Sequence, residues 1–303
     1  MGRQLPREGE VFVDHVAHFV PEMATAAERL TGLGFTLTPL AYQQNQTPEG
    51  PVPAGMANRC VMLRQGYLEF LTAVSDTPLA RRFHAAVERY VGLHLVALGE
   101  ANPDAAHARL AGEGFAPDAP VHLRRPVELP DGGTAEAQFT VLRLPADRMP
   151  EGRIQIVSHH TEAAVWQPRW LDHANSAESL DAVLLAVDDP EEAAARFGRF
   201  AGRQPQRRED GRQVLALDRG ALVFVEAGRL GDVAPWAGTV PAVPWIVGYG
   251  LGSRDPGVTR DCFAAGGIEA SDSGAAEASY VLPSPLGGFV TVGVPLGLPS
   301  WAV

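Results

Sequence analysis

Two histidines stand at equivalent places in two copies of one short unit, and their side chains are suited to metal binding or acid–base chemistry. His15 follows Asp14 in a strand-like segment, and His94 follows Leu93 in a second one. An alanine-rich helical segment ending at glycine comes next in both copies, 19 residues after the first histidine and 20 after the second. Imidazole ligates transition metals and exchanges protons near neutral pH. A repeat that preserves such a group predicts one site built by pairing the two copies.

A second cluster of polar and aromatic residues occupies positions 158–175 and contains His159 and Trp166. If the strand predicted over 153–157 continues, His159 faces the same side as residues 155 and 157, where it could act as a general base or a substitute ligand. Trp166 could then close over a bound substrate. The alternative is an inter-domain linker, with its tryptophans packed between domains and its histidines capping turns.

Composition and charge exclude several classes of protein. The 25 basic residues are all arginine and are scattered, against 36 acidic residues, so no basic stripe suited to nucleic acid appears. Residues 1–10 lack the apolar core of a signal peptide, and no apolar run of 18 residues occurs. Cys60 and Cys262 are the only cysteines, and neither has a Cys or His neighbour at zinc-finger spacing, so the chain is not a disulfide scaffold or a zinc finger. We expect a cytoplasmic protein that binds neither membranes nor nucleic acid.

The elements that position these residues form a βαβββ unit. Alternating apolar residues predict a strand over 11–20, and apolar residues at helical spacing predict a helix that starts near Met23 and stops at Gly32 and Gly34. The expected remainder is a short strand over 35–40, a loop over 43–55, and a hairpin of strands 58–63 and 67–73.

The unit then returns three times. A connecting helix over 75–90 leads to the second copy, and a polar segment over 161–177 leads to the third. The expected elements of the second copy are a strand 92–98, a helix 104–111, a Pro-rich loop 117–130, and strands 135–144 and 153–157; those of the third are 180–187, 191–200, 213–217 and 221–226; those of the fourth are 244–250, a helix from 255, 278–282 and 288–294.

This pattern predicts an α+β fold of four βαβββ modules. One helix covers only one face of a four-stranded sheet, so a single module leaves a face and an edge uncovered. Two modules paired edge to edge give a curved mixed sheet with helices outside and a cleft inside. We therefore expect two domains, 8–162 and 176–297, each a pair of modules around a cleft.

These modules resemble the vicinal oxygen chelate (VOC) superfamily, in particular the glyoxalase, bleomycin-resistance and extradiol-dioxygenase group. The resemblance spans about residues 11 to 295 and depends on the order and period of short motifs. The segments that carry it are 14–16, 32–35, 57–58, 67–70 and 93–95. That family places divalent-metal ligands on the first and last strands of two paired modules. The resemblance implies a metal site formed by four residues, His15, Glu69, His94 and Gln155, with glutamine at the position that more usually holds a carboxylate.

The implied chemistry is that of a metal-dependent lyase, isomerase or dioxygenase acting on a small oxygen-rich metabolite. Two imidazoles, one carboxylate and one amide oxygen suit Zn, Ni, Co, Mn or Fe(II). The ion would act as a Lewis acid on vicinal oxygens, and Glu69 could alternate between ligation and proton transfer. Tyr67 shares a strand face with Glu69, and Arg153 shares one with Gln155, so both are candidate substrate-binding residues.

Two alternatives stay open. The first is a metal-free protein that binds or sequesters a small molecule, as bleomycin-resistance proteins do. The second is that the later modules have no metal site of their own, because Ala182 and either Gly248 or Tyr249 stand where the histidine would be. An extradiol dioxygenase would carry its metal in that second pair, so this activity is disfavoured. The second domain would then support the first or form a homodimer.

Overall fold

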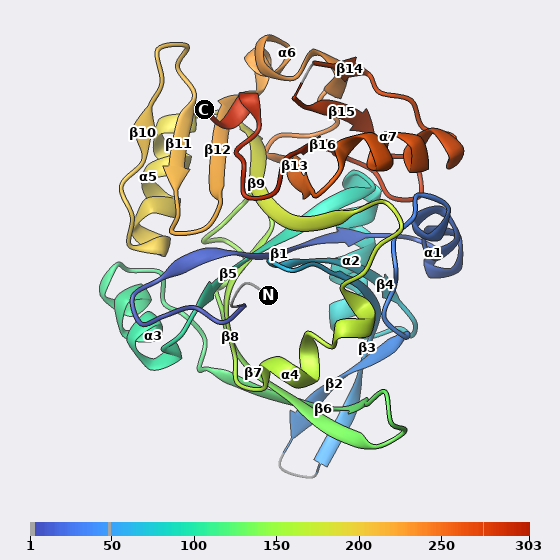
Figure 1. Cartoon of the computed structure of the whole chain (residues 1–303). Coiled ribbons are helices and arrows are strands. Elements are labelled where there is room, and N and C mark those ends of the chain that lie inside the picture. Colours follow the sequence, from blue (N-terminus) through green and yellow to red (C-terminus); the bar gives the residue numbers. More distant parts are fainter. Residues whose placement is uncertain (1–3, 48–49, 275) are drawn as a thin grey trace.

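A computed structural model describes residues 4–47, 50–274 and 276–303 of the chain. The first module consists of β1 (Val11–Phe19), α1 (Met23–Gly32), β2 (Ala41–Thr47), β3 (Gly50–Met62) and β4 (Tyr67–Ala73). β1 pairs in parallel with β4, and β4, β3 and β2 follow as antiparallel neighbours (Figure 1). The strands therefore lie in the order β1-β4-β3-β2.

The same strand order recurs along the rest of the chain. After α2 (Pro78–Arg89), the elements are β5 (Gly92–Glu100), α3 (Pro103–Gly112), β6 (Val121–Glu128), β7 (Thr134–Arg143) and β8 (Arg153–His159); then α4 (Glu162–Val165), η1 (Pro168–Trp170), β9 (Ala177–Val187), α5 (Pro190–Ala201), β10 (Gln206–Arg207), β11 (Gln213–Ala216) and β12 (Ala221–Glu226); then η2 (Ala227–Arg229), α6 (Leu230–Val233), η3 (Pro235–Ala237), β13 (Trp245–Ser253), α7 (Pro256–Ala265), β14 (Asp272–Ser273), β15 (Ala278–Val281), β16 (Phe289–Gly293) and η4 (Ser300–Ala302). In each group the first strand pairs in parallel with the last.

Neighbouring modules join through their first strands. β1 pairs antiparallel with β5, and β9 pairs antiparallel with β13. A single residue pair, Ile246 with Leu93, links β13 to β5, so the described strands form one continuous sheet. A mixed α+β fold of βαβββ-like modules is thus confirmed. The division into domains 8–162 and 176–297 stays a prediction.

α1 and α3 bury one face of the sheet in the first two modules. Leu68 and Phe70 of β4 pack in the same apolar cluster as Leu30 of α1, and Ile154 and Ile156 of β8 belong to it too. All are nearly inaccessible to water. Burying such a side chain contributes about 1.5–3 kcal/mol each, so this cluster fixes which residues of β4 and β8 point to the opposite face. Glu69 and Gln155 point there.

The corresponding face of β9 and β13 is covered by the chain's own aromatic residues. Trp301 of η4 is fully buried beside Ala182, the position that matches His15 in the third module. Its indole N–H donates to the Thr291 hydroxyl at 2.9 Å. Large side chains therefore occupy this face of the later modules.

Two predicted loops and one predicted strand are wrong. Residues 35–40 form no strand, whereas β2 and β3 occupy most of the segment expected to be a loop over 43–55, and β6 lies within the expected loop 117–130. β2 is rich in polar residues and β6 contains Pro126, and neither composition is typical of a strand, so the sequence did not indicate them. Pro53 lies where β3 pairs with β2 alone, a place where a missing N–H costs little.

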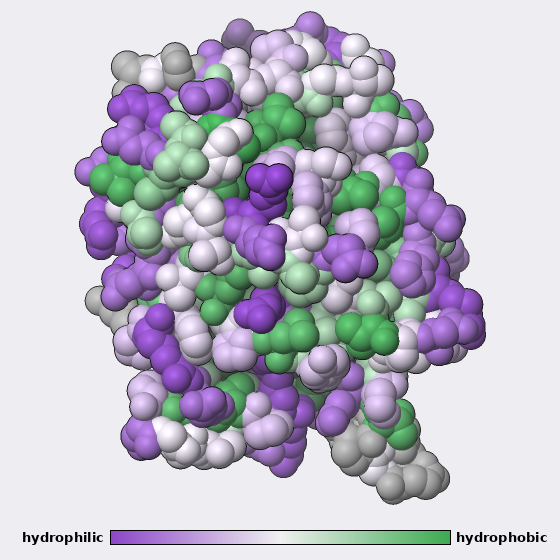
Figure 2. Space-filling view, turned by 90° about the vertical axis from the view of Figure 1, so that its right-hand side faces the viewer, coloured by the Kyte–Doolittle hydropathy of each residue, from purple (hydrophilic) through white to green (hydrophobic). Residues whose placement is uncertain are grey.

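No helix in the described segments is both long and apolar enough to cross a membrane. On the face of the molecule shown in Figure 2, hydrophobic residues are interrupted by hydrophilic ones.

Candidate functional site

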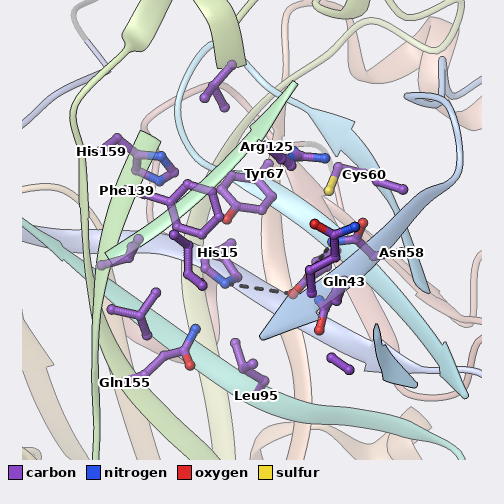
Figure 3. A pocket seen from close by; sticks show the side chains of 18 of the residues that line it. His15, Gln43, Asn58, Cys60, Tyr67, Leu95, Arg125, Phe139, Gln155 and His159 are labelled. Atoms are coloured by element: carbon purple, nitrogen blue, oxygen red, sulfur yellow. Dashed lines mark hydrogen bonds and ion pairs between the residues drawn. The ribbon is translucent and has the colours of Figure 1, made fainter. Parts of the chain in front are cut away.

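A cavity opens on the face of the first two modules that lies opposite α1 and α3. His15 of β1, Tyr67 and Glu69 of β4, and two residues of β8, Gln155 and His159, line it (Figure 3). Further lining residues are Gln43, Asn58, Cys60, Met62, Leu95, Leu123, Arg124, Arg125, Phe139, Val141, Arg143, Arg153 and Val157. The pairing of β1 with β5 therefore brings residues more than 100 positions apart into one site.

His15 is held between two carboxylates. Its Nδ1 lies 2.6 Å from Asp14 Oδ1, and its Nε2 lies 3.9 Å from Glu69 Oε2. Burial raises the pKa of Asp14, but His159 and His15 outweigh it and bring that pKa well below its usual range. An ionised carboxylate only accepts hydrogen bonds, so Nδ1 of His15 carries a proton in this contact. The other ring nitrogen, Nε2, faces Glu69.

A β-bulge brings the Asp14 carboxylate to His15. Val13 pairs with Leu98 and His15 pairs with Ala97, so Asp14 is an extra residue in β1. The regular alternation is broken here: Val13 packs in the core on the helix side, not on the face of His15 as its spacing predicts. Sequence reasoning missed Asp14, although its position directly before a candidate histidine was a usable signal.

His159 lines the cavity, and its ring holds Asp14 from the other side. Its Nε2 lies 3.3 Å from the same Asp14 oxygen, and its ring packs edge-on against Trp166 at 4.7 Å between centroids. The Nδ1 atom is buried without a hydrogen-bond partner among the described residues. His15 and His159 therefore contact the same oxygen of Asp14, and the role of His159 as a general base stays a prediction.

Glu69 and Tyr67 complete the surroundings of His15. The Asn58 amide donates to Glu69 Oε1, which leaves the second carboxylate oxygen toward His15. The Tyr67 ring stacks on the His15 ring at 4.3 Å. Burial, with the nearby charges of Asp14 and Glu69, raises the pKa of Tyr67 well above its ordinary value. Its hydroxyl is therefore protonated at neutral pH.

Gln155 and Arg153 both line the cavity and contact each other. Arg153 Nε donates to Gln155 Oε1 at 3.1 Å. The amide oxygen predicted to ligate a metal thus already accepts a hydrogen bond from a cation.

His94 does not line the cavity, which corrects the prediction that His15, Glu69 and His94 converge on one point. The His94 Nε2 lies 2.8 Å from the Tyr90 carbonyl oxygen, and its ring stacks on Tyr90 at 4.0 Å. The cause is a second bulge: Ala17 pairs with Leu95 and His18 with Leu93, so His94 is left between them. Burial lowers the pKa of His94 to about 4, and the ring is neutral at physiological pH.

Trp166 also lies outside the lining. It is buried in a small cluster with Cys60, Met62 and Leu171, and its ring meets Tyr67 edge-on at 6.0 Å. The tryptophan therefore supports the wall of the cavity from behind, where the sequence predicted contact with substrate.

The donor atoms in this cavity do not fit the four-ligand metal centre that the sequence implied. Within the described segments, no cluster of three or more His, Cys, Asp or Glu side chains is arranged to hold a metal ion. His15 and Glu69 remain as a pair, His94 is directed elsewhere, and Gln155 is engaged by Arg153. Catalytic metal sites commonly use three protein ligands, so two are too few.

Comparisons with known proteins agree on the family and the fold. The family model described as a glyoxalase-like domain matches residues 13–200, more than half of the chain. No curated protein matches. A hypothetical protein from Staphylococcus aureus has a similar structure, with a TM-score of 0.64 and 10% identity over 94% of this chain and 99% of that one.

Two similar structures have named activities. A mutant 4-hydroxymandelate synthase from Streptomyces coelicolor aligns with a TM-score of 0.57 and 13% identity, over 96% of this chain and 95% of that one. The Mn(II)-bound glyoxalase from Novosphingobium aromaticivorans aligns with a TM-score of 0.54 and 11% identity, over 97% of this chain and 84% of that one. At these identities the likeness concerns the fold.

Proposed function

Since this chain belongs to the glyoxalase-like domain family of the VOC superfamily, we propose that its cavity binds a small oxygen-rich molecule and that His15 transfers a proton on it. The observation that carries this proposal is the line from Asp14 through His15 to Glu69, with distances of 2.6 and 3.9 Å. A histidine oriented at Nδ1 by a buried carboxylate presents a basic Nε2, which is the arrangement that general-base catalysis requires.

The reaction class that follows is isomerisation, or elimination, through loss of a proton beside a carbonyl group. His15 Nε2 takes the proton from the carbon, and the bonding electron pair moves toward the carbonyl oxygen. The Asp14 carboxylate stabilises the imidazolium that forms. Return of the proton to a neighbouring atom gives an isomer, with Glu69 close enough to take part in the relay. Departure of a leaving group instead gives a lyase.

No step of this proposal passes through a metal ion, because the donor set is incomplete. The similar glyoxalase from Novosphingobium aromaticivorans is Mn(II)-bound, but of the four ligands predicted for this chain only His15 and Glu69 face each other in the described structure. Dioxygen chemistry, which the sequence also suggested, needs a redox metal and is not part of the proposal. Binding without catalysis, the bleomycin-resistance alternative, is the second candidate, because a cavity with this lining can hold a small molecule without reacting with it.

Proton exchange with solvent tests the proposal and separates these two candidates. The probes are 2-oxo acids and α-hydroxyketones in D₂O, and ¹H NMR follows the loss of the signal from the carbon-bound proton. We expect exchange with the wild-type protein and a decrease of at least about 100-fold in His15→Asn. His94→Asn is the matched control, because it removes a buried imidazole outside the cavity.

The outcomes are distinct. Binding of a probe without exchange would favour the binding protein. Exchange that is equally fast in His15→Asn would contradict the assignment of His15 as the base.

A further inference from the structure

The cavity has an unusual charge for this protein. The whole chain has a formal charge of -11, yet four arginines line the cavity, Arg124, Arg125, Arg143 and Arg153, against one carboxylate, Glu69. Arg124 is exposed and lies 3.8 Å from Glu136. The other three are only partly accessible to water.

Arg143 and Arg153 lie close together at one end of the cavity. Arg143 of β7 is paired in register with Gln155 of β8, and Arg153 stands two residues before Gln155 on the same face. Burial lowers the pKa of Arg153 to about 10, and the charge of Arg143 adds to this effect, while Glu69 opposes it. Two guanidinium groups are therefore held near each other in a partly dehydrated place.

These two guanidinium groups lack the ion pairs that most arginines of this chain form. Arg109 pairs with Glu100, Arg196 with Glu151, and other arginines pair similarly. Within the described segments, neither Arg143 nor Arg153 has a carboxylate oxygen within 4.0 Å. Glu69 and the exposed Asp118 act on them only from farther away. The Arg143 Nε is buried and has no hydrogen-bond partner among the described residues. An unpaired charge in such a place destabilises the free protein unless a ligand neutralises it.

Apolar side chains line the cavity beside this arginine pair. Leu95 of β5, Val141 of β7 and Val157 of β8 line it. His15 and Gln155 are separated by one strand, because both pair with Ala97. Strands are spaced by about 4.8 Å, so a ligand must extend over roughly 10 Å to reach from one to the other. Figure 3 shows Gln155 and Leu95 on one side of His15, with Arg125 on the other.

We infer that Arg143 and Arg153 bind the oxyanion of an amphipathic organic acid whose apolar body lies along Leu95, Val141 and Val157. The inference rests on the proposed function for the group at the His15 end, but the binding itself requires no reaction. Guanidinium groups recognise carboxylates and phosphates through paired hydrogen bonds. Gln155 then has the role of a positioning residue, since its amide oxygen fixes the orientation of Arg153.

Calorimetry with three matched probes tests this inference on the full-length protein. Phenylacetate and phenyl phosphate carry an oxyanion on an aromatic body, and phenylacetamide is the neutral counterpart of the first. We expect the anions to bind and the amide to bind at least about tenfold more weakly. The tighter of the two anions identifies the ligand as a carboxylate or a phosphate ester.

Variants locate the binding. Arg143→Met and Arg153→Met should each weaken anion binding by about tenfold or more, whereas Arg254→Met, which changes an exposed arginine outside the cavity lining, should leave it unchanged. Both lining variants should also raise the melting temperature of the free protein, because each removes an unpaired charge. This second readout shows that a variant has folded.

The inference would be overturned by no binding of either anion up to about 10 mM, a range in which millimolar affinity is visible. Binding of the amide as tight as that of the anions would also reject it. So would a loss of anion binding in Arg125→Met when Arg143→Met and Arg153→Met keep wild-type affinity. His15→Asn separates the two proposals. Retained anion binding together with unchanged proton exchange in that variant would reject the function assigned to His15 and leave the arginine site standing.

Discussion

Asp14 and His15 are neighbours in the sequence, yet their side chains meet at 2.6 Å on the same side of the sheet. In a regular strand, successive side chains point to opposite faces. The bulge in β1 makes the contact possible, and the fully buried carboxylate fixes which nitrogen of His15 faces the cavity. The chemistry assigned to this cavity therefore depends on one irregular residue.

Replacing Asp14 by asparagine tests this dependence. The neutral amide keeps the size of the side chain but cannot stabilise an imidazolium or hold Nδ1–H as firmly. We expect proton exchange to fall by about 100-fold or more in Asp14→Asn, measured by ¹H NMR as for His15→Asn. The matched control is Asp181→Asn, which changes the residue before Ala182 at the equivalent place of the third module. A full-rate Asp14→Asn variant would be inconsistent with this role.

The fold could largely be anticipated from sequence, whereas the site could be only in part. Alternating apolar residues located β1, β4 and β8, since burial against the helices imposes a strict period on them. The same period placed Glu69 and Gln155 in the cavity. It failed at His94, where a bulge shifts the backbone by one residue, because a bulge changes pairing without changing composition.

The arginine site shows a different limit of sequence reasoning. Arg153 was expected on the face of Gln155, and it lies there. Arg143 belongs to the last residues of a predicted strand, and its relation to Arg153 depends on the register of β7 against β8. Register is determined by the whole hairpin and its packing, so local sequence could not reveal that two cations share one end of the cavity.

Removing divalent metals tests whether the proposed proton transfer proceeds without a metal ion. Because His15 and Glu69 are too few donors for a tight site, we expect proton exchange to survive dialysis against a chelator with less than a twofold change. Elemental analysis of protein purified without a metal-affinity column should accordingly give a sub-stoichiometric content. Activity that disappears with the chelator and returns with Zn, Ni, Mn or Fe(II) would restore the metalloenzyme interpretation.

Trp301 tests how the later modules are stabilised. Its side chain packs in the apolar cluster that contains Ala182, and its indole N–H forms a hydrogen bond to the Thr291 hydroxyl. Truncation of a buried tryptophan leaves a cavity and typically costs about 3–5 kcal/mol, so Trp301→Ala should lower the free energy of unfolding by that amount. Guanidinium denaturation measures it. Affinity for phenylacetate should be unchanged, since Trp301 is not part of the lining of the cavity that contains His15.

The burial of Asp181 predicts a pH dependence of stability that is independent of the cavity lined by His15. Both carboxylate oxygens are buried, and burial raises the pKa of Asp181 to about 7 from 3.8, while the nearby Ser179 hydroxyl and Leu296 N–H lower it in part. A folded pKa above the unfolded one means that the neutral carboxyl is favoured by folding. Its stabilising contribution is complete below about pH 3.8, declines as the pH rises toward 7, and is absent above that range.

Asp181→Asn removes this titration, since an amide carries no charge at any of these pH values. The variant should differ little from wild type near pH 4 and should be more stable at pH 8, by at most roughly 4 kcal/mol for a shift of this size. Thermal unfolding of both proteins at each pH measures the difference. A gap in melting temperature that is the same at pH 4 and pH 8 would show that Asp181 does not titrate in this range, and that its effect on stability is one of packing alone.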